Sequence, residues 1–317
     1  MIFSKNRLFH LLFIICALTP SIATHSAERN NLTRSQPLDW GLYQIYWGIE
    51  PYSNLLKKEI HQLGGKPKHA MFFRDLIRPF PRKAIEFNDS LGLTTIVSLE
   101  LTIWGKGDKT NYLERINNGE FDSKFQAWAI AAADWEKSLV YRFGFEMNAN
   151  WFSWGNKPEA FKTAWKRIYQ IFKTNHADNV QWRFSPNILW EHRTYENNLL
   201  PYYPGDEYVD SVGLDGYNFG DHHDQWHKWE SYEKVFDFSI NEIARFKKPI
   251  YLSEIGCADG ERKQQWMKAF LEKVSADNRV HGFTYFNFDK RKENEPNWRI
   301  GSDAQSLDVF KNWAKEN

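Results

Sequence analysis

Two glutamates, Glu146 and Glu254, are the residues of this 317-residue sequence best placed for acid–base chemistry. Glu146 follows the apolar run LVYRFGF, and Glu254 follows IYLS. Two carboxylates that face each other suit cleavage of a glycosidic bond. One must be protonated to donate to the leaving oxygen, and the other must be ionised to attack the anomeric carbon or to activate water. A separation of about 5 Å predicts retention of configuration, and roughly 6.5–9.5 Å predicts inversion.

Eight apolar runs of strand length recur along the chain and must position these glutamates. They cover residues 40–47, 69–73, 94–101, 138–145, 180–186, 208–214, 249–255 and 282–288. Between them, apolar residues recur at helical spacing. The clearest sets are Phe161, Trp165, Ile168 and Phe172 after Pro158; Phe125, Trp128 and Ala132; Trp266, Phe270 and Val274; and, in a last helix, Leu307, Phe310 and Trp313.

Alternating strands and helices predict a single (β/α)8 barrel. A doubly wound open sheet is the competing fold. It usually carries a glycine-rich phosphate turn after its first strand, and YQIYWG at residues 43–48 is not such a turn. Barrel active sites lie where the strands end, and polar or aromatic residues follow nearly every predicted strand. They are Arg74, Asp75, Glu100, Trp104, Glu146, Asn187, Trp190, Asp215, Tyr217, Asn218, Glu254, Asn287 and Asp289.

Strict alternation of side chains sharpens the geometry around both glutamates. It places Val140, Arg142 and Gly144 on the face of Glu146, and Ile250, Leu252 and Gly256 on the face of Glu254. If both glutamates point inward, Arg142 does too. A buried charge needs a partner, so we expect Arg142 to support a carboxylate. The competing interpretation is an ion pair in the barrel core without chemistry.

The first residues have the pattern of an export signal. Lys5 and Arg7 precede an apolar run over residues 8–17 that is too short to span a membrane, and small residues end at Ala23. We therefore expect a cleaved signal peptide over residues 1–23, with an alternative cut after Ala27.

An extended segment over residues 24–37 and a catalytic domain over residues 38–317 are expected to follow the signal. The mature protein is then secreted or periplasmic. It keeps only Cys257, so no internal disulfide can form.

The amino-acid composition limits the classes of molecule that the protein is expected to bind. The net charge of +1 argues against nucleic acid and, after signal cleavage, against a membrane surface. Aromatic residues reach 17%, with 15 tryptophans, and exposed aromatic rings suit sugars with apolar C–H faces. We expect a monomer that acts on a polysaccharide and needs no cofactor.

Five segments together resemble glycoside hydrolase family 26, the family of β-mannanases with some mixed-linkage β-glucanases. They are RFGFEMNANWFSWG (142–155), PEAFKTAWKRIY (158–169), SPN (185–187), YPGDEYVDSVGLDGYN (203–218) and KPIYLSEIG (248–256). The resemblance extends from about Gly41 to Trp313.

The resemblance implies a (β/α)8 barrel and a retaining mechanism. Glu146 matches the acid/base of the family and Glu254 matches its nucleophile. Tyr217 matches a tyrosine that hydrogen-bonds the nucleophile, and Trp151 matches an aromatic residue that lines the sugar site. One position departs from the family pattern, because Phe145 replaces the usual histidine before the acid/base. Strict alternation turns Phe145 outward against the helices, whereas a bulged strand end would turn it toward the sugar.

Other residues near the predicted strand ends have two interpretations each. Four indoles could either stack on sugars or pack within their loops; they are those of Trp151, Trp154, Trp226 and Trp229. Glu100 and Trp104 could contact substrate, or Glu100 could pair with Arg74 or Arg142. Asn187 is a further candidate ligand of the substrate, and Asn148 is expected to order its loop. Asp215 precedes the turn residue Gly216, which fits a structural role.

The cluster Asp221, His222, His223, Asp224 and His227 has the composition of a metal site without the spacing of a structural zinc site. A polar rim of the substrate groove fits it better, and we predict no metal.

The sequence therefore predicts a retaining endo-β-glycanase that hydrolyses a β-1,4-linked, mannan-type polysaccharide. The alternatives are a mixed-linkage β-glucanase, a hydrolase of a bacterial exopolysaccharide, and a non-catalytic polysaccharide-binding barrel.

Overall fold

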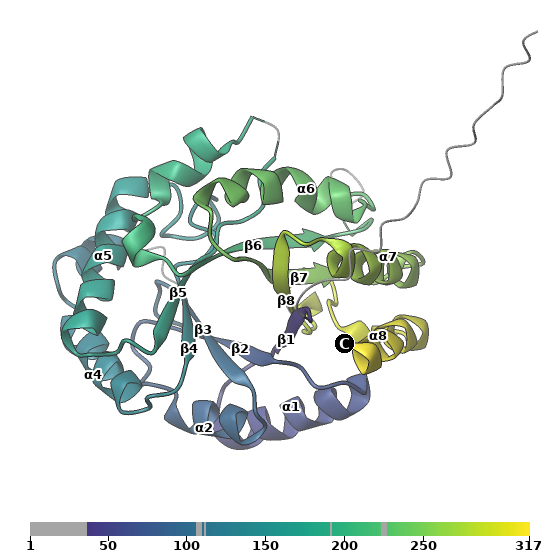
Figure 1. Cartoon of the computed structure of the whole chain (residues 1–317), viewed down its shortest axis with the longest axis horizontal. Helices are drawn as coiled ribbons and strands as arrows, with labels where there is room; N and C mark the ends of the chain where they lie inside the picture. The colour runs from purple at the N-terminus through teal and green to yellow at the C-terminus, as the bar shows by residue number, and fades with distance from the viewer. Residues whose placement is uncertain (1–36, 106–109, 111, 191, 223–226) are drawn as a thin grey trace, which may run out of the picture. The chain divides into compact units, whose positions relative to one another are not determined.

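The computed structural model describes residues 37–105, 110, 112–190, 192–222 and 227–317. In these residues eight parallel strands follow one another in chain order and close into a barrel, because β1 pairs with both β2 and β8 (Figure 1). The strands are β1 (Asp39–Tyr43), β2 (His69–Arg74), β3 (Thr94–Leu99), β4 (Leu139–Phe143), β5 (Val180–Phe184), β6 (Ser211–Asn218), β7 (Ile250–Cys257) and β8 (Val280–Tyr285). The predicted (β/α)8 barrel is confirmed, and the open doubly wound sheet is excluded.

Helices surround the barrel on the outside (Figure 1). They are α1 (Ile49–Leu63), α2 (Arg82–Ser90), α3 (Tyr112–Asn117), α4 (Asp122–Ala133), α5 (Pro158–Thr174), α6 (Tyr232–Ile243), α7 (Lys263–Ala276) and α8 (Ala304–Glu316). The four predicted helical patterns lie on α5, α4, α7 and α8, and Pro158 opens α5 in the first-turn position that suits proline.

The core has two layers because neighbouring residues of a strand point to opposite faces. Outward residues pack against the helices, as where Trp165 of α5 contacts Phe143 and Trp182 at ring distances of 5.8 Å each. Inside the barrel a second cluster forms from Tyr43, Met71, Ile96, Val140, Ala258, Phe286 and Trp298. Many of the aromatic residues therefore serve the core.

Several predicted strand ends are wrong at the edge that carries the polar residues. The first run was expected to continue to residue 47, but β1 ends at Tyr43. The fourth was expected to reach residue 145, but β4 ends at Phe143. The sixth was expected to end at residue 214, but β6 continues to Asn218. Apolar residues continue into the loops at this opening, which we call the mouth, so hydrophobicity alone could not locate the strand ends.

The predicted signal peptide and most of the extended segment lie outside the described residues. Among the helices that the structure describes, none combines the length and the apolar character needed to cross a membrane.

Candidate active site

Glu146 lies at the mouth, directly after β4, in a turn of unusual backbone geometry. Gly144 has φ of +55°, and a Cβ atom at this residue would lie 2.9 Å from both Leu101 Cδ1 and Phe161 Cε2. Glu146 itself has φ of +53°, which is uncommon for a residue other than glycine. The backbone thus leaves the strand path before the carboxylate, and the surrounding structure holds Glu146 in this conformation.

Both carboxylate oxygens of Glu146 accept hydrogen bonds. Asn187 Nδ2 donates to Oε1 at 2.8 Å, and Trp151 Nε1 donates to Oε2 at 2.5 Å. The side chain is nonetheless buried, and burial raises the pKa of Glu146 to about 7, with a further rise from the negative charge of Glu254. A carboxyl group with such a pKa can be protonated near neutral pH, as a general acid must be.

Glu254 lies on β7 at a β-bulge. Leu252 pairs with Leu214 and Glu254 pairs with Asp215, so Ser253 is an extra residue in the strand. The bulge breaks the predicted alternation. Ile250 and Leu252 pack in the layer that faces the helices, whereas Glu254 reaches the interior of the barrel. The prediction that Ile250, Leu252 and Glu254 share a face is therefore wrong.

Glu254 accepts hydrogen bonds that suit an ionised carboxylate. Arg142 Nη1 donates to its Oε1 at 2.6 Å, and Tyr217 OH donates to its Oε2 at 2.8 Å. Burial and the charge of Glu254 raise the pKa of Tyr217 well above its ordinary value, so the phenol keeps its proton and remains a donor. Glu146 and Glu254 therefore have different partners: two uncharged N–H groups donate to Glu146, whereas a guanidinium and a phenol donate to Glu254.

Arg142 is fully buried inside the barrel and binds two carboxylates. Besides Glu254, its Nη2 donates to both oxygens of Asp215 at 2.7 and 2.6 Å, and Ser98 and Ser185 accept further hydrogen bonds. Burial alone would lower the pKa of Arg142, but Asp215 and Glu254 raise it, so the guanidinium stays charged. Arg142 therefore supports a carboxylate, as expected, and its side chain is enclosed by the protein and does not reach the surface of the mouth.

Phe145 turns inward, toward Arg142, and its side chain is buried. Its ring stacks on Phe73 at 5.2 Å and lies 5.1 Å from the guanidinium carbon of Arg142. Phe152 and Trp154 enclose it from the loop side. Since β4 ends at Phe143 and the positive φ of Gly144 redirects the backbone, strict alternation no longer applies at Phe145. An apolar ring therefore covers the Arg142 network at the mouth.

The sequence profile described as glycosyl hydrolase family 26 matches residues 116–310, which is more than half of the chain. This chain belongs to glycosyl hydrolase family 26. Endoglucanase H of Acetivibrio thermocellus is 30% identical over 205 residues, covering 62% of this chain and 22% of that protein. Mannan endo-1,4-beta-mannosidase A and B of Caldalkalibacillus mannanilyticus is 32% identical over 114 residues, covering 32% of this chain and 21% of that protein. The chain thus spans about a fifth of the length of either relative.

Solved structures agree with this family on the fold. A family 26 beta-mannanase from Bacteroides ovatus superposes with a TM-score of 0.66 at 20% identity, covering 89% of each chain. An endo-beta-1,4-mannanase from Cellulomonas fimi gives the same TM-score at 18% identity, covering 89% of this chain and 71% of the other.

Asn187, which donates to Glu146, is also bound to the loop after β4. Its backbone N–H donates to Asn148 Oδ1 at 2.8 Å, while Asn148 Nδ2 donates to the carbonyl oxygen of Asn187 at 3.0 Å. Asn148 therefore orders the loop, in agreement with the sequence-based interpretation. The side-chain Oδ1 of Asn187 is buried and accepts no hydrogen bond from any described residue.

Glu100 and Trp104 contact each other at the end of β3. Trp104 Nε1 donates to Glu100 Oε2 at 2.8 Å. Burial raises the pKa of Glu100 to about 7. The ion pairs of the described residues do not join Glu100 to Arg74 or Arg142, so neither expected partner is found.

The tryptophans of the mouth divide into exposed and buried ones. Trp151 and Trp190 are about half exposed, and their rings meet edge to face at 6.1 Å. Trp154 is buried, stacks on Phe152 at 4.3 Å, and donates to the carbonyl oxygen of Phe145. Of its two interpretations, loop packing is the one that fits Trp154. Trp226 lies outside the described residues, and Trp229 donates to Asp221.

The histidine-rich segment is described only in part, since His223 and Asp224 are outside the described residues. His227 stacks on Phe219 at 4.3 Å. Within the part of the chain that can be described, no three His, Cys, Asp or Glu side chains come together as metal ligands.

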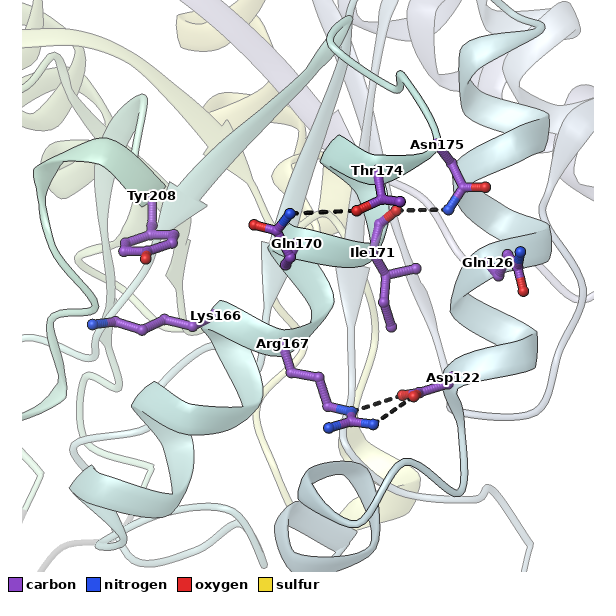
Figure 2. A pocket seen from close by; sticks show the side chains of 9 residues that line it. All are labelled: Asp122, Gln126, Lys166, Arg167, Gln170, Ile171, Thr174, Asn175 and Tyr208. Atoms are coloured by element: carbon purple, nitrogen blue, oxygen red, sulfur yellow. Dashed lines mark hydrogen bonds and ion pairs between the residues drawn. The ribbon is translucent and has the colours of Figure 1, made fainter.

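A cavity of about 630 Å³ lies away from the mouth, between α4 and α5 (Figure 2). It is lined by Asp122, Gln126, Lys166, Arg167, Gln170, Ile171, Thr174, Asn175 and Tyr208. Its single carboxylate, Asp122, is bound by Arg167 at 2.8 and 2.5 Å, so this cavity lacks the carboxylate pair that glycosidic cleavage requires.

Some members of the site were missed by reasoning from the sequence. Ser98, Ser185 and the bulged Ser253 have small side chains with no catalytic signature, although they line the Arg142 network. Trp47 was missed as well, because the first strand was predicted to continue to residue 47. The strand β1 ends at Tyr43, so Trp47 belongs to the loop that follows it at the mouth.

Proposed function

We propose that this family 26 protein is a retaining endo-β-glycanase that hydrolyses a β-1,4-linked, mannan-type polysaccharide. The supporting observation is the pair of buried glutamates at the mouth. Glu146 has a pKa raised to about 7 by burial, and Glu254 accepts hydrogen bonds from Arg142 and Tyr217. This is the division of roles that a two-carboxylate mechanism needs.

In the proposed mechanism Glu146 donates its proton to the glycosidic oxygen while Glu254 attacks the anomeric carbon. A covalent glycosyl-enzyme forms, and the leaving chain departs with the proton. Glu146, now ionised, takes a proton from water, and the resulting hydroxide equivalent releases the glycosyl unit from Glu254. Arg142 and Tyr217 hold the Glu254 carboxylate in place, and Asn187 and Trp151 orient Glu146.

The relatives support the choice of polymer. Proteins named mannan endo-1,4-beta-mannosidase from several organisms share 27–32% identity with parts of this chain. The test is a panel of soluble β-mannan, mixed-linkage β-glucan and bacterial exopolysaccharide, with new reducing ends as the readout and proton NMR of the first anomer formed. We expect mannan to be cut fastest, with retained configuration. Inverted products, or no new reducing ends from any polymer, would overturn the proposal.

A mixed-linkage β-glucan is the second candidate substrate. The relative that covers 62% of this chain is named an endoglucanase, whereas the first mannosidase covers 32%. Phe145 also places an apolar ring at the mouth, where it offers no hydrogen bond to a sugar hydroxyl. Faster hydrolysis of the β-glucan than of β-mannan in the same panel would favour this candidate.

We also propose that residues 1–23 are removed on export and that the mature protein acts as a monomer outside the cytoplasm. Mass spectrometry of the protein recovered from periplasm and medium tests the cleavage, and a mature N-terminus at residue 24 or 28 is expected. Size-exclusion chromatography with light scattering tests the monomer.

A further inference from the structure

Three tryptophans are conspicuously exposed in the described part of the chain. They are Trp47 at 65%, Trp151 at 50% and Trp190 at 46%. Each follows a strand at the mouth, after β1, β4 and β5 respectively. Indole rings are usually buried, so rings left open beside a polysaccharide site are available to stack on sugars. Trp151 donates to Glu146 and Trp190 contacts Trp151, but Trp47 follows a different strand and needs its own explanation.

Trp47 belongs to a cluster with Arg78 and Trp104, which we call the Trp47 platform. The rings of Trp47 and Trp104 meet edge to face at 5.2 Å. The guanidinium carbon of Arg78 lies 4.4 Å from the Trp104 ring centre and 5.7 Å from that of Trp47. The loops after β1, β2 and β3 thus each supply one side chain to a single surface.

A buried carboxylate holds the Trp47 platform in shape. Asp75 is fully buried, and its Oδ2 accepts from Arg78 Nη1 at 2.7 Å and from the backbone N–H of Trp104 at 3.1 Å. Its Oδ1 accepts from the backbone N–H of Arg78 at 3.1 Å. Side chains fixed in this way lose little conformational freedom when a ligand binds.

The platform is continuous with the catalytic centre. Trp104 Nε1 donates to Glu100, and the negative charge of Glu254 adds to the rise in the pKa of Glu100 that burial causes. Glu100 is thus in contact with the platform and near enough to Glu254 to sense its charge. On the other side of the mouth, Trp151 donates to Glu146, Trp190 contacts Trp151, and Arg193 lies 4.9 Å from the Trp190 ring. Glu100 and Glu146 are thus each bound by one tryptophan of a pair, and each pair has an arginine beside it.

We propose that the Trp47 platform binds a neutral sugar unit of the polysaccharide at a distance from the bond that is cut. The inference rests on the proposed function. The open face of Trp47 stacks on the apolar C–H face of the sugar, and Arg78 donates to its hydroxyl groups. A chain held here and at Trp151 crosses the mouth with support on both sides of the catalytic glutamates, which favours cleavage within a polymer.

The first experiment compares long and short substrates with Trp47→Ala. On a hexasaccharide of whichever polymer the wild type cuts, we expect kcat/KM to fall on the order of tenfold, mainly through KM. On an aryl disaccharide of the same sugar, which covers only the centre, we expect a change within about twofold. Trp47→Phe should recover most of the loss because it restores a ring.

Ile77→Ala is the matched control, since Ile77 is 57% exposed in the neighbouring loop beside Arg78 and lacks an aromatic ring. It should leave both substrates unaffected. Equal losses on long and short substrates in Trp47→Ala would assign Trp47 a structural role and overturn the inference. If kcat/KM of Trp47→Ala rises with the length of the substrate as steeply as that of the wild type, the inference is overturned as well.

The second experiment separates failure of the platform from failure of the proposed function. Affinity electrophoresis in gels that contain galactomannan or mixed-linkage β-glucan needs no hydrolysis. Glu254→Ala should be retarded in at least one gel, and Trp47→Ala combined with Glu254→Ala should be retarded less. If the wild type cuts no polymer but this difference persists, the hydrolase proposal fails while the platform stands. Equal retardation of the two variants in every gel overturns the platform.

Discussion

The indole nitrogen of Trp151 donates a hydrogen bond to Oε2 of Glu146 at 2.5 Å, although half of the indole is exposed. This bond stabilises the ionised carboxylate, as does the bond from Asn187 to Oε1. Burial and Glu254 act in the opposite direction and raise the pKa of Glu146 to about 7. A residue at the surface thus helps to set the proton affinity of a buried acid.

Trp151→Phe should move the alkaline limb of the pH–rate profile to higher pH. The acid must be protonated to donate, so activity is present below the pKa of Glu146 and is lost as pH rises through it. Removal of a donor to the carboxylate raises that pKa, by about half a unit to one unit for a partly exposed bond. The measurement is kcat/KM against pH from 4 to 10.

Two controls accompany this profile. Trp190→Phe alters the neighbouring exposed ring without touching Glu146 and should leave the limb in place. Glu100→Gln removes the other mouth carboxyl whose pKa burial raises to about 7, and should also leave it in place. A limb that moves with Glu100→Gln and not with Trp151→Phe would assign the titration to Glu100.

Replacement of either proposed catalytic glutamate should abolish most turnover of polysaccharide without unfolding the protein. Glu146→Ala should lower kcat on polysaccharide by about 10²–10⁴, but much less on an aryl glycoside whose leaving group needs no proton. Glu254→Ala should lower kcat on both, because the attacking group is gone. Circular dichroism and thermal unfolding check the fold. Near-normal turnover in either variant would contradict the assigned roles.

Arg142→Met should destabilise the barrel strongly. It leaves Asp215 and Glu254 buried without their cation, a change that costs about 3–5 kcal/mol of unfolding free energy. Urea unfolding measures the loss. Lys268→Met is the control, since it removes an exposed ion pair with Glu272 that should contribute less than about 1 kcal/mol. Similar losses in the two variants would show that the Arg142 network does not stabilise the fold.

Phe145→His tests the position at which this chain departs from its family. An imidazole placed among Phe73, Phe152 and Arg142 buries a polar group, so we expect a loss of about 1–3 kcal/mol in unfolding free energy. It also offers a hydrogen bond at the mouth, and we expect the ratio of mannan to β-glucan hydrolysis to rise. Phe145→Leu keeps the site apolar and should leave the ratio unchanged. A constant ratio in both variants would exclude Phe145 from substrate choice.

Much of this architecture could be predicted because its signals are local. The apolar residues of α5, from Phe161 to Phe172, recur at helical spacing whatever lies around them. Each strand contains a short apolar run that can be recognised in the sequence. Once the barrel is predicted, the ends of its strands are the expected site, which is how Glu146, Glu254 and Tyr217 were brought together from distant parts of the chain.

Orientation at the mouth was decided by the tertiary structure. Period-2 alternation fails at Gly144, whose positive φ redirects the chain, and at Ser253, which adds a residue to β7. A glycine near a strand end can mark a bulge, but it does not show which way the next side chain turns, and Ser253 gives no signal of the extra residue in β7. Phe145 turns inward and Glu254 changes face for this reason.

The sequence by itself determined the order of strands and helices and the residue types that gather where the strands end, because these depend on spacing along the chain. Only the tertiary structure decided which side chains meet: Arg142 with Asp215 as well as Glu254, Trp104 with Glu100, and Trp47 with Arg78. The physical reason is that a buried charge or an exposed ring takes its partner from whichever strand end lies beside it in the closed barrel, and closure sets those neighbours.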